Sequence, residues 1–100
     1  LATFSKGSNG YYKFNNGLII QWGRTHIPGT TTVGTAVTQT LPIAFTTENY
    51  GVSANVFAVQ EAYARGHVSL NGKSTTTLTF RLSDMTYVAG GTIYWIAIGY

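Results

Sequence analysis

Residues 10–24, GYYKFNNGLIIQWGR, have the pattern of a β-hairpin. The first strand, Tyr11–Phe14, is rich in aromatic residues, and the turn segment Asn15–Gly17 supplies residues that tolerate positive φ angles. The second strand, Leu18–Trp22, is apolar on both of its faces. A strand with two apolar faces needs a cover on each side. In a chain of 100 residues, we expect one of these covers to be another copy of the chain.

The composition indicates a single all-β domain. The chain has 100 residues, which is enough for one modest core and too few for two domains. Only 9% of the residues are charged, against about 25% in a typical soluble domain. Thr, Tyr, Gly and Val are frequent, and these residues favour strands and turns over helices.

Charge and cysteine content argue against several classes of function. Six Lys and Arg and three acids give a net charge of +3, but they form no basic run, so we expect no nucleic-acid partner. The absence of cysteine removes disulfides and thiolate metal sites, and oligomerisation is one usual alternative source of stability. No stretch of about 18 consecutive apolar residues occurs, so we expect no membrane insertion. Because the chain begins with Leu1, we expect it to be a fragment of a longer protein.

Three further segments have strand patterns. Val52–Gln60 alternates with a period of two and is partly apolar on both faces. Ser74–Ser83 has one apolar and one polar face, whereas Thr92–Tyr100 is apolar on both. A short helical turn within 48–66 is the one helical alternative. Turn-forming clusters separate the strands at 5–10, 15–17, 28–34, 46–51, 71–74 and 89–91, a spacing typical of sandwiches and barrels.

Catalytic chemistry has little support in the sequence. The acids are Glu48, Glu61 and Asp84, and the histidines are His26 and His67. A glycosidase would need two of the acids within about 5 to 9 Å of each other, an arrangement that the sequence neither indicates nor excludes. Ser69, His67 and Asp84 could supply a Ser–His–Asp set, but no nucleophile elbow or glycine-rich oxyanion segment accompanies them. We therefore expect no enzyme, no metal site and no cofactor.

Binding is the remaining class of function. Tyr and Trp offer large contact areas at low entropic cost, and Tyr, Arg, His and Asn in loops stack on sugars and hydrogen-bond their hydroxyls. The alternative for each such residue is a capping aromatic or a solvated charge. The candidate receptor-binding residues are Tyr50, Tyr63, Arg65, His67, Asn71 and Tyr87. If these residues do not bind the receptor, Thr25–Thr35 is the alternative binding loop.

Three segments together resemble a known family. They are GYYKFNNGLIIQWGR at 10–24, LPIAFTTENYGVSANV at 41–56 and TIYWIAIGY at 92–100. In this order they are similar to the C-terminal domain of bacteriophage tail fibre proteins, the gp53-like tail fibre tip family. Pro42 and Phe45 match the family's Pro-x-x-Phe segment, whereas Thr25–Thr35 has no counterpart that aligns.

The resemblance implies a fold and a position. The fold is a small antiparallel β-sandwich over residues 10–100, with residues 1–9 as an N-terminal connection to the fibre shaft. Its position is the distal end of a trimeric fibre, outside the cell on the virion. A similar strand order and terminal tryptophan motif occur in the H-type lectins, which are trimeric sugar-binding sandwiches, so we expect a carbohydrate ligand by analogy.

The apolar strands and the resemblance both predict a homotrimer, because a threefold contact would bury the surplus apolar surface. The expected interface residues are Leu18, Ile20, Trp22, Tyr94, Ile96 and Ile98.

The expected function is attachment of a phage, or of a related contractile bacteriocin, to a bacterial surface polysaccharide or outer-membrane protein. Three tips and several fibres would strengthen weak contacts through effective concentration. The alternatives are a structural cap that ends a trimeric fibre, a small sugar-binding lectin of non-phage origin, and an enzyme that trims surface glycan.

Overall fold

The computed structural model describes residues 3–28, 34–57, 67–83 and 91–100. Within these ranges the regular structure consists of strands alone, so the all-β prediction is confirmed. The strands are β1 (Thr3–Ser5), β2 (Gly10–Lys13), β3 (Ile19–Ile27), β4 (Ala36–Thr40), β5 (Gly51–Phe57), β6 (His67–Lys73), β7 (Thr77–Ser83) and β8 (Gly91–Gly99). None of the described segments forms a helix capable of spanning a bilayer.

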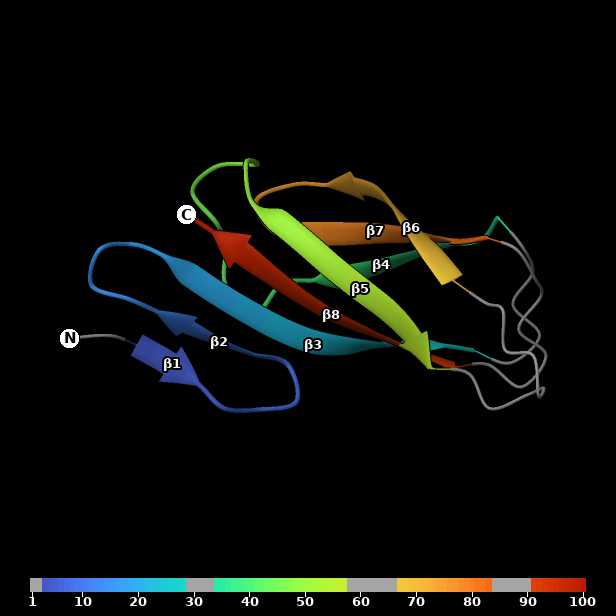
Figure 1. Ribbon diagram of the computed structural model, residues 1–100, viewed down its shortest axis with the longest axis horizontal. Coiled ribbons are helices and arrows are strands. Elements are labelled where there is room, and N and C mark those ends of the chain that lie inside the picture. Colours follow the sequence, from blue (N-terminus) through green and yellow to red (C-terminus); the bar gives the residue numbers. More distant parts are fainter. Residues whose placement is uncertain (1–2, 29–33, 58–66, 84–90) are drawn as a thin grey trace.

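Two antiparallel sheets pack face to face as a sandwich (Figure 1). The larger sheet has the strand order β1-β2-β3-β8-β5, and the smaller sheet has the order β4-β7-β6. In the larger sheet, β3 and β8 pair along their full length, from Ile19 opposite Gly99 to Ile27 opposite Gly91. The antiparallel sandwich predicted from the sequence is therefore present. The expected shaft connection at residues 1–9 includes strand β1, which pairs with β2.

The hairpin between β2 and β3 forms at the predicted turn. The Phe14 amide donates to the Leu18 carbonyl at 2.8 Å, and the Gly17 amide donates to the Phe14 carbonyl at 3.0 Å. Gly17 has a φ of 95°, a backbone conformation that is unstrained for glycine. Strand β3 continues to Ile27, well beyond the predicted end at Trp22. Residues 25–27 of the expected binding loop are thus strand residues.

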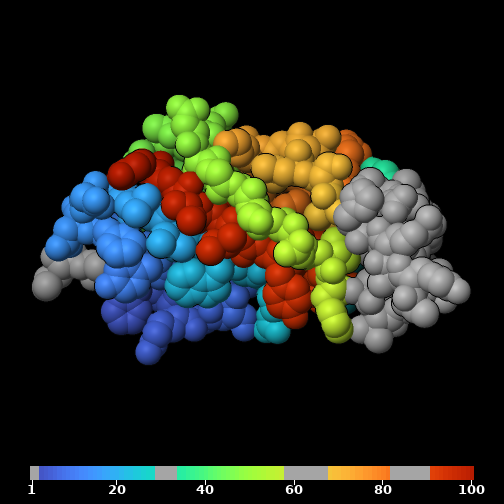
Figure 2. Space-filling model, viewed as in Figure 1, coloured from blue at the N-terminus to red at the C-terminus, as the bar shows by residue number. Residues whose placement is uncertain are grey.

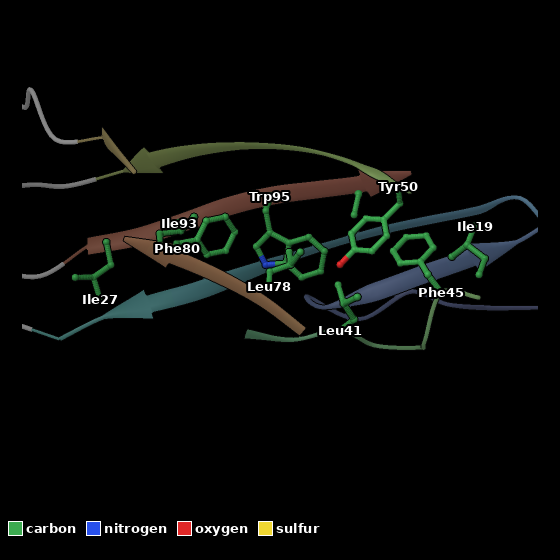
Figure 3. Close-up of a cluster of buried hydrophobic side chains, with 10 residues drawn as sticks. Ile19, Ile27, Leu41, Phe45, Tyr50, Leu78, Phe80, Ile93 and Trp95 are labelled. Atoms are coloured by element: carbon green, nitrogen blue, oxygen red, sulfur yellow. The ribbon is translucent and has the colours of Figure 1, made fainter. Parts of the chain in front are cut away.

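The predicted alternation of faces is also confirmed. In β8, Ile93, Trp95 and Ala97 point inward and are buried, whereas the side chains between them are exposed. In β7 the apolar face packs inward through Leu78 and Phe80. Figure 3 shows the buried side chains meeting between the two sheets. The core consists of Ile19, Ile27, Leu41, Phe45, Tyr50, Leu78, Phe80, Ile93, Trp95 and Ala97.

A buried glutamine connects the larger sheet to the segment that follows β4. Gln21 is fully buried, and its side chain makes two hydrogen bonds to the backbone of Ile43. Its Nε2 donates to the Ile43 carbonyl at 2.9 Å, and its Oε1 accepts from the Ile43 amide at 3.0 Å. This pairing satisfies both polar ends of the buried amide, as burial requires. Closer to the other end of β3, the Thr25 hydroxyl donates to Gln39 Oε1 at 2.8 Å.

Tyr50 is a core residue, so the prediction that it contacts a receptor from a loop surface is wrong. Its side chain is only 2% exposed, and its ring stacks on Phe45 with a centroid separation of 4.0 Å. Its hydroxyl donates to the Ser74 carbonyl at 2.6 Å, while the Lys73 ammonium lies 4.6 Å from the ring centroid. The physical reason is its position. Residues 41–50 cross from the smaller sheet to the larger one, and their aromatic side chains, Phe45 and Tyr50, pack into the core between the sheets.

Aromatic residues pack closely against glycines of the larger sheet, with their rings at Gly10 and Gly23 and with the Tyr50 backbone at Gly99. A Cβ atom at Gly23 would be 2.5 Å from Trp95 Cζ2, and one at Gly10 would be 2.8 Å from Trp22 Cζ2. A Cβ atom at Gly99 would be 2.8 Å from the Tyr50 Cα. Real Cβ atoms do not approach other heavy atoms so closely. Each of these aromatic residues therefore needs a glycine on the neighbouring strand.

We predict that Gly23→Ala lowers the free energy of unfolding by about 1–3 kcal/mol, because overpacking displaces the Trp95 ring or the backbone. Urea unfolding followed by tryptophan fluorescence measures the change. Gly72→Ala is the matched control, since its new Cβ would meet only Thr79 Cβ at 3.9 Å. Equal loss of stability in the two variants would contradict the role assigned to Gly23.

The free energy of unfolding should depend on the ionisation of Tyr50 at high pH. Burial raises the pKa of the Tyr50 phenol above its usual value of 10.0, and the Glu48 carboxylate raises it further. A raised folded-state pKa means that the associated stability is complete below pH 10 and is lost as the pH rises through the folded pKa. Tyr50→Phe should therefore unfold more easily than the wild type at pH 7, by about 1 kcal/mol for the lost hydrogen bond, and lose less stability above pH 10.

Urea titrations between pH 7 and pH 11 test this expectation. Tyr12→Phe changes an exposed tyrosine and serves as the control, with the pH dependence of the wild type. A Tyr50→Phe variant that loses as much stability as the wild type above pH 10 would show that this phenol is not the group responsible.

Candidate functional site

The outward face of the larger sheet is apolar and exposed. Tyr94, Ile96 and Ile98 of β8 are 46%, 41% and 45% exposed, and Figure 2 shows this strand running across the visible face of the domain between β3 and β5. Other exposed apolar side chains on β1, β2 and β5, or directly after β2 and β8, are Phe4, Tyr12, Phe14, Phe57 and Tyr100. Exposed apolar side chains gathered on one face of a sheet mark an interaction site.

Within this face, β5 and β8 border an open hollow of about 260 Å³. Its lining consists of Gly51, Val52, Ser53, Ile96 and Ile98. Gly51 lies opposite Ile98 and has no side chain to fill the space beside it. The hollow therefore offers a recess for an apolar side chain from another surface.

The outward face of the smaller sheet has a different character. Thr38, Thr40 and Arg81 are exposed there, and the hydroxyls of Thr38 and Thr79 lie 3.5 Å apart. Threonine and arginine side chains are compatible with water, so this face needs no cover. The exposed apolar side chains of the two outer faces thus gather mainly on the larger sheet, whereas the described outer face of the smaller sheet is polar.

The expected trimer-interface residues lie on the apolar face. Tyr94, Ile96 and Ile98 are exposed, and the side chains of Ile20 and Trp22 on the neighbouring strand are half-buried. Leu18, just before β3, is also half-buried. The structure contains one chain, so the role of these residues in a trimer stays a prediction.

Three of the six expected receptor-binding residues lie outside the described part of the chain. Tyr63 and Arg65 belong to residues 58–66 and Tyr87 to residues 84–90, which are not described. His67 begins β6, but its side chain is outside the described set. Asn71 is exposed as expected, although it lies within β6 beside a bulge between Leu70 and Gly72, and not in the predicted turn.

The described strand ends next to these residues lie at one end of the sandwich. The chain leaves the described structure there after Pro28, Phe57 and Ser83, and the next strands begin at Ala36, His67 and Gly91 (Figure 1). Strand β1 begins and β8 finishes at the opposite end. A fibre joined through β1 would therefore direct these strand ends away from its shaft.

The candidate catalytic groups that are described do not meet. Glu48 lies near Tyr50, whose neighbour Gly51 pairs with Ile98, whereas His26 pairs with Thr92 near the other end of β8. Within the described ranges, no three His, Asp or Glu side chains are grouped closely enough to share a metal ion. Glu61 and Asp84 lie outside these ranges.

Solved structures of pyocin tail fibres have the same fold. An N-truncated R1-type pyocin tail fibre matches the whole chain with a TM-score of 0.82 and 30% identity, and the match covers 86% of that fibre chain. The C-terminal part of the R2 pyocin fibre of P. aeruginosa matches with a TM-score of 0.77 and 31% identity, over 26% of its length. The fold is thus that of the C-terminal domains of phage-type tail fibres.

The family model of the "putative tail fiber protein gp53-like, C-terminal" domain matches residues 13–100, and the chain belongs to this family. An uncharacterized protein of the archaeon Methanocaldococcus jannaschii is 32% identical over 95% of the chain. The chain spans 65% of the length of that relative. The family resemblance predicted from the hairpin, the central segment and the last strand is therefore confirmed.

Proposed function

We propose that this domain is the distal receptor-binding tip of a trimeric tail fibre, which attaches a phage or contractile bacteriocin to a bacterial surface glycan or outer-membrane protein. One observation carries the proposal: the strand ends at 27, 57 and 83 lie opposite the end where β1 begins. A tip held through β1 would present the intervening segments to the cell. Segments carried on a rigid sandwich are common positions for recognition residues.

The proposed activity is binding without chemical change. The part of the larger sheet's outward face that carries Ile96 and Ile98 would pack against two further copies, while the polar face of the smaller sheet stays in water. Tyr63, Arg65, His67 and Tyr87 remain the receptor-binding residues predicted from the sequence, in or beside the segments that leave the sandwich at this end. Binding by three identical tips would raise the effective concentration of each weak contact.

Adsorption of the isolated domain to bacterial cells tests the proposal. We expect a fluorescently labelled domain to bind a susceptible strain, and the changes Tyr63→Ala, Arg65→Ala, His67→Ala and Tyr87→Ala to reduce adsorption at least about threefold without altering oligomeric state. Thr40→Ala, at an exposed position on the smaller sheet, should bind like the wild type.

Other outcomes would identify the alternatives. A folded trimer that adsorbs to no strain infected by its own phage or killed by its bacteriocin would be a structural cap. Release of reducing sugar from host polysaccharide would instead indicate an enzyme. If all four substitutions leave adsorption unchanged, the binding surface is elsewhere.

The assembly of the domain into a trimer can be tested separately from its binding to cells. The wild-type domain should have three times its chain mass of 10.8 kDa in light scattering at micromolar concentration. Ile96→Arg should weaken the trimer by at least about tenfold, because it would bury an unpaired charge in an apolar contact. Thr79→Arg, on the other outer face, should remain trimeric. A stable wild-type monomer would contradict the proposed assembly.

A further inference from the structure

A second hollow on the outward face of the larger sheet is lined by polar residues. It has a volume of about 330 Å³, and its lining residues are Ser8, Asn9, Arg24, His26 and Thr92. Three of these residues come from the strands β3 and β8, in which His26 lies directly opposite Thr92. The other two come from the connection between β1 and β2, which runs beside β3 (Figure 1). The lining supplies hydroxyl, amide, imidazole and guanidinium groups.

Hydrogen bonds fix the wall of this hollow to the strand beneath it. The Arg24 Nη2 atom donates to the Ser8 hydroxyl at 2.8 Å, and the Arg24 amide donates to Asn9 Oδ1 at 3.1 Å. The Trp22 indole donates to the Gly7 carbonyl at 3.1 Å, so the same connection is held at a third point. The polar groups are therefore arranged before any ligand arrives, which reduces the entropic cost of binding.

The charge of Arg24 is not balanced locally by the described acid. Glu48 is the one carboxylate side chain in the described ranges, and it lies beside Tyr50 near the opposite end of β8. A guanidinium carries five N–H donors, and one of its nitrogen atoms is engaged by Ser8. The remaining donors can bind a carboxylate or phosphate through two parallel hydrogen bonds.

The size and the neighbours of the hollow point to a sugar ring. Small-molecule sites have volumes of roughly 300 to 1,000 Å³, so a hollow of about 330 Å³ suits one ring-sized group. The hydroxyl and amide groups of Ser8, Asn9 and Thr92 can hydrogen-bond sugar hydroxyls. Tyr94, directly opposite Arg24 and 46% exposed, provides an aromatic surface at its border.

We propose that this hollow binds one acidic sugar residue of a surface glycan, with Arg24 paired to its carboxylate or phosphate group. The inference rests on the proposed receptor-binding function and gives that function a ligand class and a location. Sequence patterns did not indicate this site, because its lining comes from separate segments that only the fold brings together.

Nuclear magnetic resonance titration of the ¹⁵N-labelled domain tests the inference. D-glucuronate and D-glucose 6-phosphate represent the two acidic groups, D-glucose is the neutral counterpart, and inorganic phosphate lacks the sugar. We expect at least one acidic sugar to shift the amide signals of Arg24, His26 and Thr92, with at least about tenfold higher affinity than D-glucose and inorganic phosphate.

Two variants of Arg24 and one control make the test specific. Arg24→Gln should weaken binding of the acidic sugar at least about tenfold, and Arg24→Lys should give intermediate affinity because it keeps the charge without the planar fork. Arg81→Gln removes the same charge from the smaller sheet, where Arg81 donates to the Gly34 carbonyl, and should bind normally. Tryptophan fluorescence confirms that each variant is folded.

Several results would overturn the inference. They are equal affinity for D-glucose, equal affinity for inorganic phosphate, no shifts with either acidic sugar, or equal weakening by Arg81→Gln. Cell adsorption separates the two proposals. This site alone is refuted if the wild-type domain adsorbs to cells but shows no shifts with either acidic sugar, and if Arg24→Gln adsorbs equally well. A domain that binds acidic sugar but adsorbs to no cell refutes the receptor-binding function.

Discussion

The antiparallel pairing of β3 with β8 determines both the inside and the outside of this domain. Each strand carries large apolar residues on its two faces. Packing one face of the pair against the smaller sheet therefore leaves the apolar residues of the other face uncovered. Ile19 and Ile93 on one face build the core between the sheets, while Ile20 and Ile96 on the other face remain at least partly accessible. The same ladder that stabilises the sandwich therefore also creates the surface that favours association.

The register between β3 and β8 needs more than hydrophobicity to determine it. When both faces of a strand are apolar, a slip by one residue exchanges one apolar set for another, and hydrophobicity alone specifies the pairing weakly. Here the register is fixed by shape and by polarity. Gly23 must lie beneath Trp95 because no other residue leaves room for the ring. Gln21 must face inward, where the Ile43 backbone satisfies both ends of its amide. Few positions meet both conditions.

The sequence predicts the parts of this structure that depend on local pattern. The hairpin turn at 15–17 and the inward and outward faces of β7 and β8 follow from turn chemistry and a period of two. The family follows from the combination of three segments. The predicted role of Tyr50 was wrong, because an aromatic residue in a connecting segment has the same local sequence whether it faces water or packs into a core. Its burial depends on Ser74 and Phe45, which no local pattern associates with it.

The polar hollow was missed for a related reason. Arg24 was assigned to no site, His26 entered only as part of the alternative binding loop Thr25–Thr35, and Ser8 and Asn9 belong to a turn whose composition is ordinary. Their proximity arises because β2 folds back on β3, with Gly10 opposite Trp22, so that the preceding turn lies against Arg24. The bulge in β6 shows the same limit: Asn71 has turn-like neighbours, yet the pairing of Leu70 and Gly72 with β7 keeps it in a strand.

The proposed ligand site and the proposed assembly face depend on each other. A hollow for one sugar residue offers few contacts, and an exposed charged hydrogen bond contributes modestly in water. One domain alone would therefore hold a cell surface weakly. A trimer multiplies the same contact, and a surface glycan that repeats its acidic sugar would meet several hollows at an effective concentration in the millimolar range. In this arrangement Ile96 and Ile98 of β8 contribute to recognition without touching the ligand, because the contact they make determines how many copies of Arg24 reach the glycan together.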